Sequence, residues 1–336
     1  MKKKIFTEIL AFVMAFTVFI SSVYYLGYKY MPVRMNYGAT WNMYVEEPEN
    51  TIDVMFVGSS LAYCDIIPAI IYDQTGLTSY IIGAPNMNSG ISYYYLKQAL
   101  ETQTPKLIML EATTFCFPET SEKDSKINIG FMPWSLNRIA ATFKVAAPKE
   151  RLGLLFPLYN YHSRWGDYSF NAVFSPRADS ITDIWAGYTF IDVTTKQEAV
   201  KERKYDTKGK DFKENMKYLE KIIKLCDDKG IELELFIVPS CNYVSEETTE
   251  LIRKNAGNTK LTRFNDNFED LNFDLEKNFR DPLHLNFSGA EIFTRTMAEH
   301  ITDNYSITPS KKAPELWKER VENYITNSQE FEFKEK

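Results

Sequence analysis

Ile52-Asp53-Val54-Met55-Phe56-Val57 is an almost uninterrupted apolar run, and Gly58-Ser59-Ser60 follows it directly. An apolar run of this length without polar alternation is typical of a central strand in a parallel sheet, because both faces of such a strand are covered. Open α/β sheets bind their ligands beyond the carboxyl ends of the strands. This stretch therefore predicts an α/β fold whose first strand ends in two candidate functional hydroxyl groups.

The chain beyond this strand alternates predicted strands and helices. Further strands are expected at 78–82, 106–111 and 231–238, and helices at 68–76, 90–102, 211–230 and 288–301. Proline at the start and glycine at the end delimit the first of these helices, and Ser288-Gly289-Ala290-Glu291 reads as a capping box for the last. This alternation requires right-handed crossovers and predicts a three-layer, doubly wound parallel sheet.

The alternation stops between residues 117 and 205, where we expect a helical and loop insertion above the carboxyl edge of the sheet. The insertion contains His162, Arg164 and Trp165 within a short aromatic stretch. Aromatic faces and anion-binding groups suit sugar rings or phosphodiester polymers, so these residues are candidates for substrate binding. The alternative is an aromatic plug that fixes the insertion to the domain.

The two ends of the chain are also distinctive. Lysines at 2–4 precede an uncharged run, Ile9 to Leu26, which is long enough to span about 30 Å of hydrocarbon as a helix. The lysines predict a cytoplasmic N-terminus with the remaining chain outside the cell membrane. A cleaved signal peptide is less favoured, because the run is long and has no small-x-small cleavage pattern. The apolar side of the tail predicts a docking helix or a partner surface.

These features divide the chain into four parts: residues 1–30 as cytoplasmic lysine cluster and transmembrane anchor, 31–50 as juxtamembrane connector, 51–305 as the α/β domain with its insertion, and 306–336 as a polar and amphipathic tail. The formal net charge of −6 argues against a nucleic-acid partner. The four cysteines are too few and too scattered for a disulfide framework, and no metal-ligand spacing appears. We therefore expect no metal and no cofactor.

Asp281-Pro282-Leu283-His284 is the second informative motif. A serine hydroxyl is a weak nucleophile until a base removes its proton, and the base needs a third group that fixes its orientation. Histidine occurs only at positions 162, 284 and 300, and we expect His300 on a solvated helix surface. The motifs therefore predict a triad, with a capped turn and a polar loop as the alternative interpretation.

The two motifs, in this order, resemble those of the SGNH/GDSL hydrolase superfamily over roughly residues 50 to 305. The resemblance implies a flavodoxin-like fold in which Ser60 is the nucleophile, His284 the base and Asp281 its orienter. Ser59 stands where the superfamily usually has an aspartate, and it is the alternative nucleophile.

The resemblance also implies donors for the oxyanion that develops during acyl transfer. In the superfamily these are the amide of the nucleophile, a glycine after the second strand and an asparagine after the third. Here Asn86 lies near the glycine position, and Glu111-Ala112-Thr113-Thr114 replaces the block that carries the asparagine. A backbone amide near Asn86 and the side chain of Thr113 are the candidates, although both residues also suit ordinary turn and strand-end positions.

A single N-terminal anchor joined to an extracytoplasmic SGNH-like domain also resembles the plan of the D-alanyl-lipoteichoic-acid synthesis protein DltD and of membrane-anchored polysaccharide O-acetylation proteins. This resemblance implies that a membrane-bound O-acyltransferase exports an acyl group, which Ser60 accepts and passes to a cell-envelope polymer such as teichoic acid or polysaccharide. A carbohydrate esterase with the same triad is one alternative. The other is a catalytically weak scaffold that binds polymer or a membrane partner.

Overall fold

The computed structural model of the chain describes residues 2–31, 41–167 and 183–335. Its centre is a five-stranded sheet with the order β2-β1-β3-β5-β7, in which every neighbouring pair is parallel. The strands are β1 (Val54–Gly58), β2 (Ser79–Gly83), β3 (Leu107–Glu111), β5 (Glu232–Ile237) and β7 (Lys260–Arg263). Numbered within the sheet, the order is 2-1-3-4-5, as in doubly wound sheets of the flavodoxin type. The prediction of an α/β fold with a parallel sheet is confirmed.

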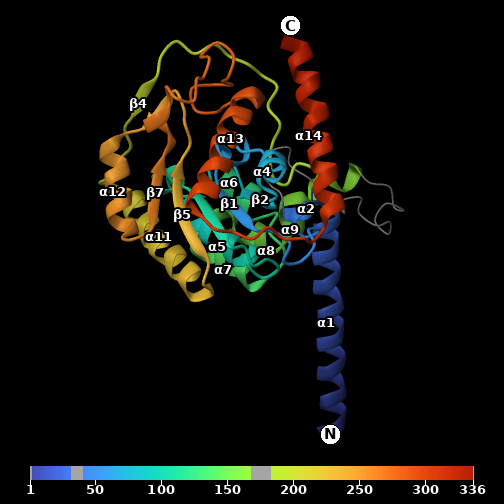
Figure 1. The fold of residues 1–336 in the computed structure, drawn as a ribbon. Coiled ribbons are helices and arrows are strands. Elements are labelled where there is room, and N and C mark those ends of the chain that lie inside the picture. Colours follow the sequence, from blue (N-terminus) through green and yellow to red (C-terminus); the bar gives the residue numbers. More distant parts are fainter. Residues whose placement is uncertain (1, 32–40, 168–182, 336) are drawn as a thin grey trace.

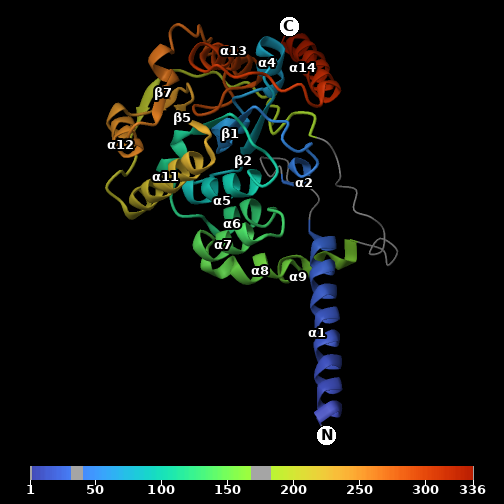
Figure 2. The same ribbon diagram turned by 60° about the horizontal axis from the view of Figure 1, so that its bottom comes forward.

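Helices cover both faces of this sheet (Figure 2). One apolar core lies between the sheet and α5 (Ser89–Ala99), α11 (Lys210–Lys229) and α12 (Glu246–Ala256). The other lies between the sheet and α3 (Ser60–Tyr63), α4 (Pro68–Thr75) and α13 (Phe287–Asn304). Along β1, Met55 and Val57 enter the first core, and Val54 and Phe56 enter the second. This alternation across a fully buried strand explains the uninterrupted apolar run in the sequence.

The described part of the insertion begins with four short helices: α6 (Glu122–Asn128), α7 (Leu136–Lys144), α8 (Arg151–Leu155) and α9 (Pro157–Tyr161). The 3-10 turns η1 (Ala112–Cys116), η2 (Pro148–Glu150) and η3 (His162–Asp167) join or extend them. The expected place of this part, above the carboxyl edge of the sheet, is wrong for α7 to α9. Helix α7 packs on the outer side of α5, and α8 and α9 continue from it toward the N-terminal helix (Figure 2).

The N-terminal helix α1 (Lys2–Tyr30) projects from the domain as a single rod (Figure 1). It is long and apolar enough to span a membrane, and its hydropathic window is fully exposed. Its last turns pack on α9 and η3. The crossing is close at Gly27, where a Cβ atom would lie 2.4 Å from the backbone nitrogen of Leu158. A glycine at this position therefore lets the helix attach directly to the domain.

Residues 183–200 form neither helix nor strand, and their turn at 184–187 lies beside the edge strand β2. Ile81 of β2 donates its backbone N–H to the carbonyl of Ala186 at 3.0 Å. Gly187, with a φ of +91°, lies so close to Ile81 that a side chain would collide with its carbonyl. The segment then leads into β4 (Lys201–Arg203), which pairs in parallel with β6 (Asn242–Val244). The turn therefore covers the middle of the open edge of β2.

The C-terminal helix α14 (Pro314–Glu335) packs on α4 and α13, so the expected docking helix docks on its own domain. Trp317 stacks on Tyr72 with 5.2 Å between ring centroids. Arg320, only 1% exposed, donates to the backbone carbonyl of Asp183 at 2.8 Å and pairs with the Glu47 carboxylate. This buried arginine ties the tail to the connector and to the segment that covers β2.

Two local predictions are wrong. Ser288 is not the cap of helix α13: the side chain of Asn286 accepts from the amide of Gly289, so the helix begins at Phe287. His300 does not lie on a solvated surface. Its Nε2 is 2.9 Å from a carboxylate oxygen of Glu234, which is itself buried on β5.

Removing the buried cation should destabilise the fold. Arg320→Ala leaves the Glu47 carboxylate buried without its partner, which typically costs about 3–5 kcal/mol. Lys318→Ala, on the exposed side of the same helix, should change stability by less than about 0.5 kcal/mol. Thermal unfolding of the full chain in detergent solution measures both. Equal melting temperatures for the two variants would contradict the structural role of Arg320.

Candidate active site

The turn after β1 determines how the two serines are presented. β1 ends at Gly58, where a Cβ atom would lie 2.6 Å from the Cβ of Glu111, so a side chain does not fit. Ser59 is the N-cap of α3 and is completely buried, and its hydroxyl accepts from the amide of Leu61 at 3.4 Å. Ser60 follows as the first helical residue and is partly exposed. Of these two serines, only Ser60 is therefore accessible to solvent.

The second motif forms a tight turn that fixes its own carboxylate. An antiparallel bridge between Phe279 and Leu285 closes the turn. Inside it, Oδ1 of Asp281 accepts the backbone N–H of Leu283 at 2.9 Å and that of His284 at 3.1 Å. The carboxylate is thus held by the backbone before it contacts any other side chain.

The two motifs meet across the carboxyl edge of the sheet. The Nε2 atom of His284 lies 2.7 Å from the Ser60 hydroxyl oxygen. The Nδ1 atom lies 2.9 Å from Oδ2 of Asp281 and 3.0 Å from Oδ1. Because a carboxylate can only accept, Nδ1 carries the proton in the neutral ring, and Nε2 is left to accept from Ser60. These distances have the geometry of a nucleophile, a base and an orienting acid.

The charge on Asp281 is stabilised where it lies. Burial raises the pKa of this carboxyl, but the hydrogen bond and charge of His284 and the two backbone amides outweigh burial, so the pKa lies below its usual range. Arg280 lies 3.8 Å from Oδ2 of the same carboxylate. The aspartate therefore stays ionised at neutral pH and can stabilise a protonated His284.

Asp65 connects the serine turn to the histidine loop, and the sequence analysis did not identify it. Its Oδ1 accepts the amide of Leu285, the residue after His284, at 3.1 Å. Burial raises the pKa of this carboxyl well above its usual value. An aspartate within the otherwise apolar stretch from Cys64 to Ile67 was the available signal, because an aspartate is rarely buried unless it is paired.

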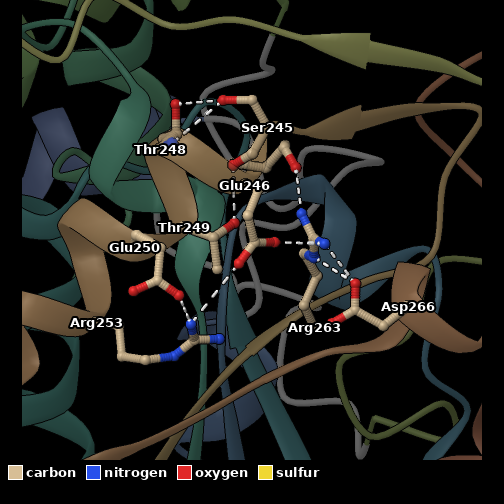
Figure 3. A network of polar contacts seen from close by, with 9 residues as sticks. Ser245, Glu246, Thr248, Thr249, Glu250, Arg253, Arg263 and Asp266 are labelled. Atoms are coloured by element: carbon tan, nitrogen blue, oxygen red, sulfur yellow. Dashed lines mark hydrogen bonds and ion pairs between the residues drawn. The ribbon is translucent and has the colours of Figure 1, made fainter.

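The histidine loop is also supported from the β6 side. Asn242 of β6 donates its amide to the carbonyl of Pro282 at 2.8 Å. Beyond β6, Arg263 of β7 forms ion pairs with Glu246 at the start of α12 and with Asp266 (Figure 3). This polar network joins the start of α12 to the end of β7, and Arg263 also donates to the carbonyl of Val244 in β6 at 3.4 Å.

Glu111 lies directly beneath the serine turn. The carboxylate accepts from the amide and the hydroxyl of Thr113, at 2.9 and 2.5 Å, and from the hydroxyl of Ser59. Burial raises the pKa of Glu111 to about 7, against the lowering effect of these donors. An ionisable group that titrates near neutral pH therefore supports the turn that presents Ser60.

The oxyanion candidates lie in different environments. Thr113 is buried, and both its amide and its hydroxyl are donated to Glu111, so its position does not support a role as a donor to substrate. Asn86 is exposed, has a φ of +49° and contacts Asp124 at 3.4 Å through its side chain. The amide of Ser60 stands at the first position of α3, where an N–H has no acceptor within the helix.

The structure does not bring the substrate-binding candidates to the triad. His162 is exposed and bonds to the carbonyl of Tyr159 at 3.0 Å, and Arg164 donates to the carbonyl of Tyr30 at 2.8 Å. Both belong to the segment that packs on α1, on the opposite side of the sheet from α13 (Figure 2). The side chain of Trp165 lies outside the described residues.

Comparison with known proteins adds no further assignment. No protein-family model matches the chain, and no curated protein matches it either. Within residues 2–31, 41–167 and 183–335, no group of three or more histidine, cysteine or acidic side chains is arranged to hold a metal ion. The triad geometry is therefore the main observation from which a function can be inferred.

Glu111 should make stability depend on pH. The pKa of Glu111 is raised to about 7 in the folded chain, so the folded state favours the protonated carboxyl. The contribution of this carboxyl to folding stability is fully present below about pH 4.5 and is lost as the pH rises through about 7. Relative to Glu111→Gln, which does not titrate, the wild type should lose about 2–3 kcal/mol between pH 5 and pH 8. Denaturant unfolding of both proteins at the two pH values measures this difference. A difference independent of pH would contradict the raised pKa.

Proposed function

We propose that the chain is a membrane-anchored serine acyl-transfer enzyme whose domain lies outside the cytoplasm. The observation that carries the proposal is the hydrogen-bonded chain from Ser60 through His284 to Asp281, with distances of 2.7 and 2.9 Å. Enzymes that use a serine as nucleophile at a carbonyl carbon place a base within hydrogen-bond distance of the hydroxyl. A carboxylate then orients that base from its other side.

The first half-reaction follows from this arrangement. Nε2 of His284 takes the proton of Ser60 as its oxygen attacks the acyl carbonyl, and the Asp281 carboxylate stabilises the imidazolium. The developing oxyanion is bound by backbone donors, of which the Ser60 amide is the nearest candidate. His284 then gives its proton to the leaving group, and the acyl group remains on Ser60 as an ester.

The second half-reaction decides between transfer and hydrolysis. His284 removes a proton from the acceptor, the acceptor oxygen attacks the ester carbonyl, and the Ser60 oxygen recovers the proton. With a hydroxyl of a cell-envelope polymer as acceptor, the enzyme is an O-acyltransferase, and with water it is an esterase. We favour the transferase, supplied by a membrane-bound O-acyltransferase, because of the architectural resemblance described above.

The anchor is part of the proposal. An apolar helix near the N-terminus can be a membrane span or a signal sequence, and α1 satisfies the requirements of length and composition for both. A retained span is favoured by the packing of Gly27 and Tyr30 on α9 and η3, because the end of the helix is thereby part of the fold.

Orientation can be tested on cells from which the wall has been removed. Added protease should degrade the domain, because the lysines before α1 favour a cytoplasmic N-terminus. A cytoplasmic protein serves as the control for membrane integrity. Full protection of the domain, or a shortened soluble form released from the membrane, would contradict the anchored external domain.

Hydrolysis of a small aryl acetate tests the triad in the purified full chain, because this reaction needs little substrate recognition. Ser60→Ala and His284→Ala should abolish turnover, and Asp281→Asn should lower it by up to about four orders of magnitude, as in other triads. Ser59→Ala is the matched control and should retain turnover, because the Ser59 hydroxyl lies beneath the turn. Wild-type turnover at the level of Ser60→Ala would contradict an activated serine.

The same variants distinguish the three functions in a deletion strain. Loss of polymer acylation with Ser60→Ala supports the transferase, whereas increased acylation indicates the esterase. If Ser60→Ala restores acylation as fully as the wild type, the chain acts as a scaffold and the proposal is wrong.

A further inference from the structure

The exposed apolar side chains of the domain are concentrated in the segment that contains α7, α8 and α9, the last of which packs on α1. Outside α1, ten large apolar side chains are exposed among the described residues, and six of them lie between residues 134 and 159. The six, which we call the platform residues, are Trp134, Leu136, Phe143, Leu152, Phe156 and Tyr159. Single exposed apolar residues are ordinary, but a concentration on one surface indicates an interaction site.

Helix α7 exposes apolar side chains although it has polar side chains that it buries instead. Its buried side carries Asn137, Arg138, Ala141 and Thr142, whereas Leu136 and Phe143 are exposed and Ile139 and Ala140 are half-buried between them. Leu136 is 83% exposed. A helix on the surface of a soluble domain normally has the opposite arrangement, with its apolar side buried. The outward face of α7 is therefore more apolar than its inward face.

Buried polar contacts hold this surface in place. The guanidinium of Arg138 donates to the carbonyls of Met132 and Leu154, at 2.8 and 2.9 Å, and lies 5.2 Å from the Trp134 ring centroid. The Arg138 side chain thus connects α8 with the turn that precedes α7. The platform residues are presented by a fixed scaffold instead of a loose loop.

The position of α1 sets the level of this surface relative to a bilayer. The uncharged run of α1 ends at Leu26, and the ring of Tyr24, within the same run, packs against Trp134 with 5.0 Å between centroids. Tyrosine and tryptophan are enriched where hydrocarbon meets the headgroups. Helices α7, α8 and α9 form a row that starts at α1, at the end of the domain from which α1 leaves (Figure 2).

We propose that the platform residues are immersed in the outer headgroup region of the bilayer that α1 spans. Helices α7 to α9 then lie along the membrane surface, and the domain contacts the bilayer through this surface as well as through α1. Interfacial helices of this kind bury their apolar face about 5–10 Å into the headgroup and acyl boundary. The proposal rests on the membrane anchor of the proposed function, but not on its chemistry.

Spin-label accessibility in vesicles tests this proposal. The full chain is reconstituted in phosphatidylcholine and phosphatidylglycerol, with single labels at Leu136→Cys and Leu152→Cys. Phe12→Cys reports on the span, and Glu247→Cys, exposed on α12 far from α1, reports on the aqueous side. The wild-type chain, treated identically, gives the background from the native cysteines. Dissolved oxygen concentrates in the bilayer, whereas a neutral nickel chelate stays in water.

Labels at 136 and 152 should be more accessible to oxygen than to the nickel chelate, as at 12 but at shallower depth, while the label at 247 should show the reverse order. If the labels at 136 and 152 behave like the label at 247 while the label at 12 remains in the bilayer, the surface proposal is wrong and the membrane anchor is supported. If the label at 12 is also accessible to the nickel chelate, α1 does not span the bilayer and the anchor assignment is wrong. Labels at 136 and 152 that are shielded from both reagents would indicate a second protein copy and would overturn the lipid assignment.

Discussion

The hydrogen bond between Ser60 and His284 joins positions that are 224 residues apart, and much of the fold serves to bring them together. The parallel sheet places the end of β1 at its carboxyl edge, and α13 packs on α4, which follows the serine turn. Two polar contacts fix the relative position of these segments: Asp65 binds the amide of Leu285, and Thr294 accepts the amide of Ile67 at 3.0 Å. Because these contacts are buried, a displacement of either segment would leave unpaired polar groups in the core.

The sequence predicted those elements whose burial is uniform. β1, β2 and β3 are buried along their whole length, and β5 is buried over its last four residues. The residues of the candidate triad follow from motifs whose chemistry is local. It did not predict β7, because Lys260–Arg263 is a short edge strand with polar residues on either side of Leu261. Nor did the sequence place α7. Amphipathic helices are normally assumed to bury their apolar side, whereas α7 buries its polar side. His162 and Arg164 were assigned by residue type, but their partners are set by tertiary packing on α1.

The attachment of α1 has a mechanical consequence for the proposed chemistry. A flexible linker would let the domain search a large volume, whereas packing at Gly27 and the bond from Arg164 to Tyr30 fix the domain at the end of the helix. The catalytic edge of the sheet would then lie at a constant height above the membrane. This suits an acyl group delivered from a membrane protein to an acceptor that is anchored nearby.

The central claim is that Ser60 is an activated nucleophile, and covalent labelling tests it most directly. The full chain in detergent is treated with a fluorophosphonate, digested and mapped by mass spectrometry. Our account predicts one phosphonyl adduct on Ser60, absent from His284→Ala and retained in Ser59→Ala. No adduct on the wild type, or an adduct on Ser59 with Ser60 unmodified, would contradict it.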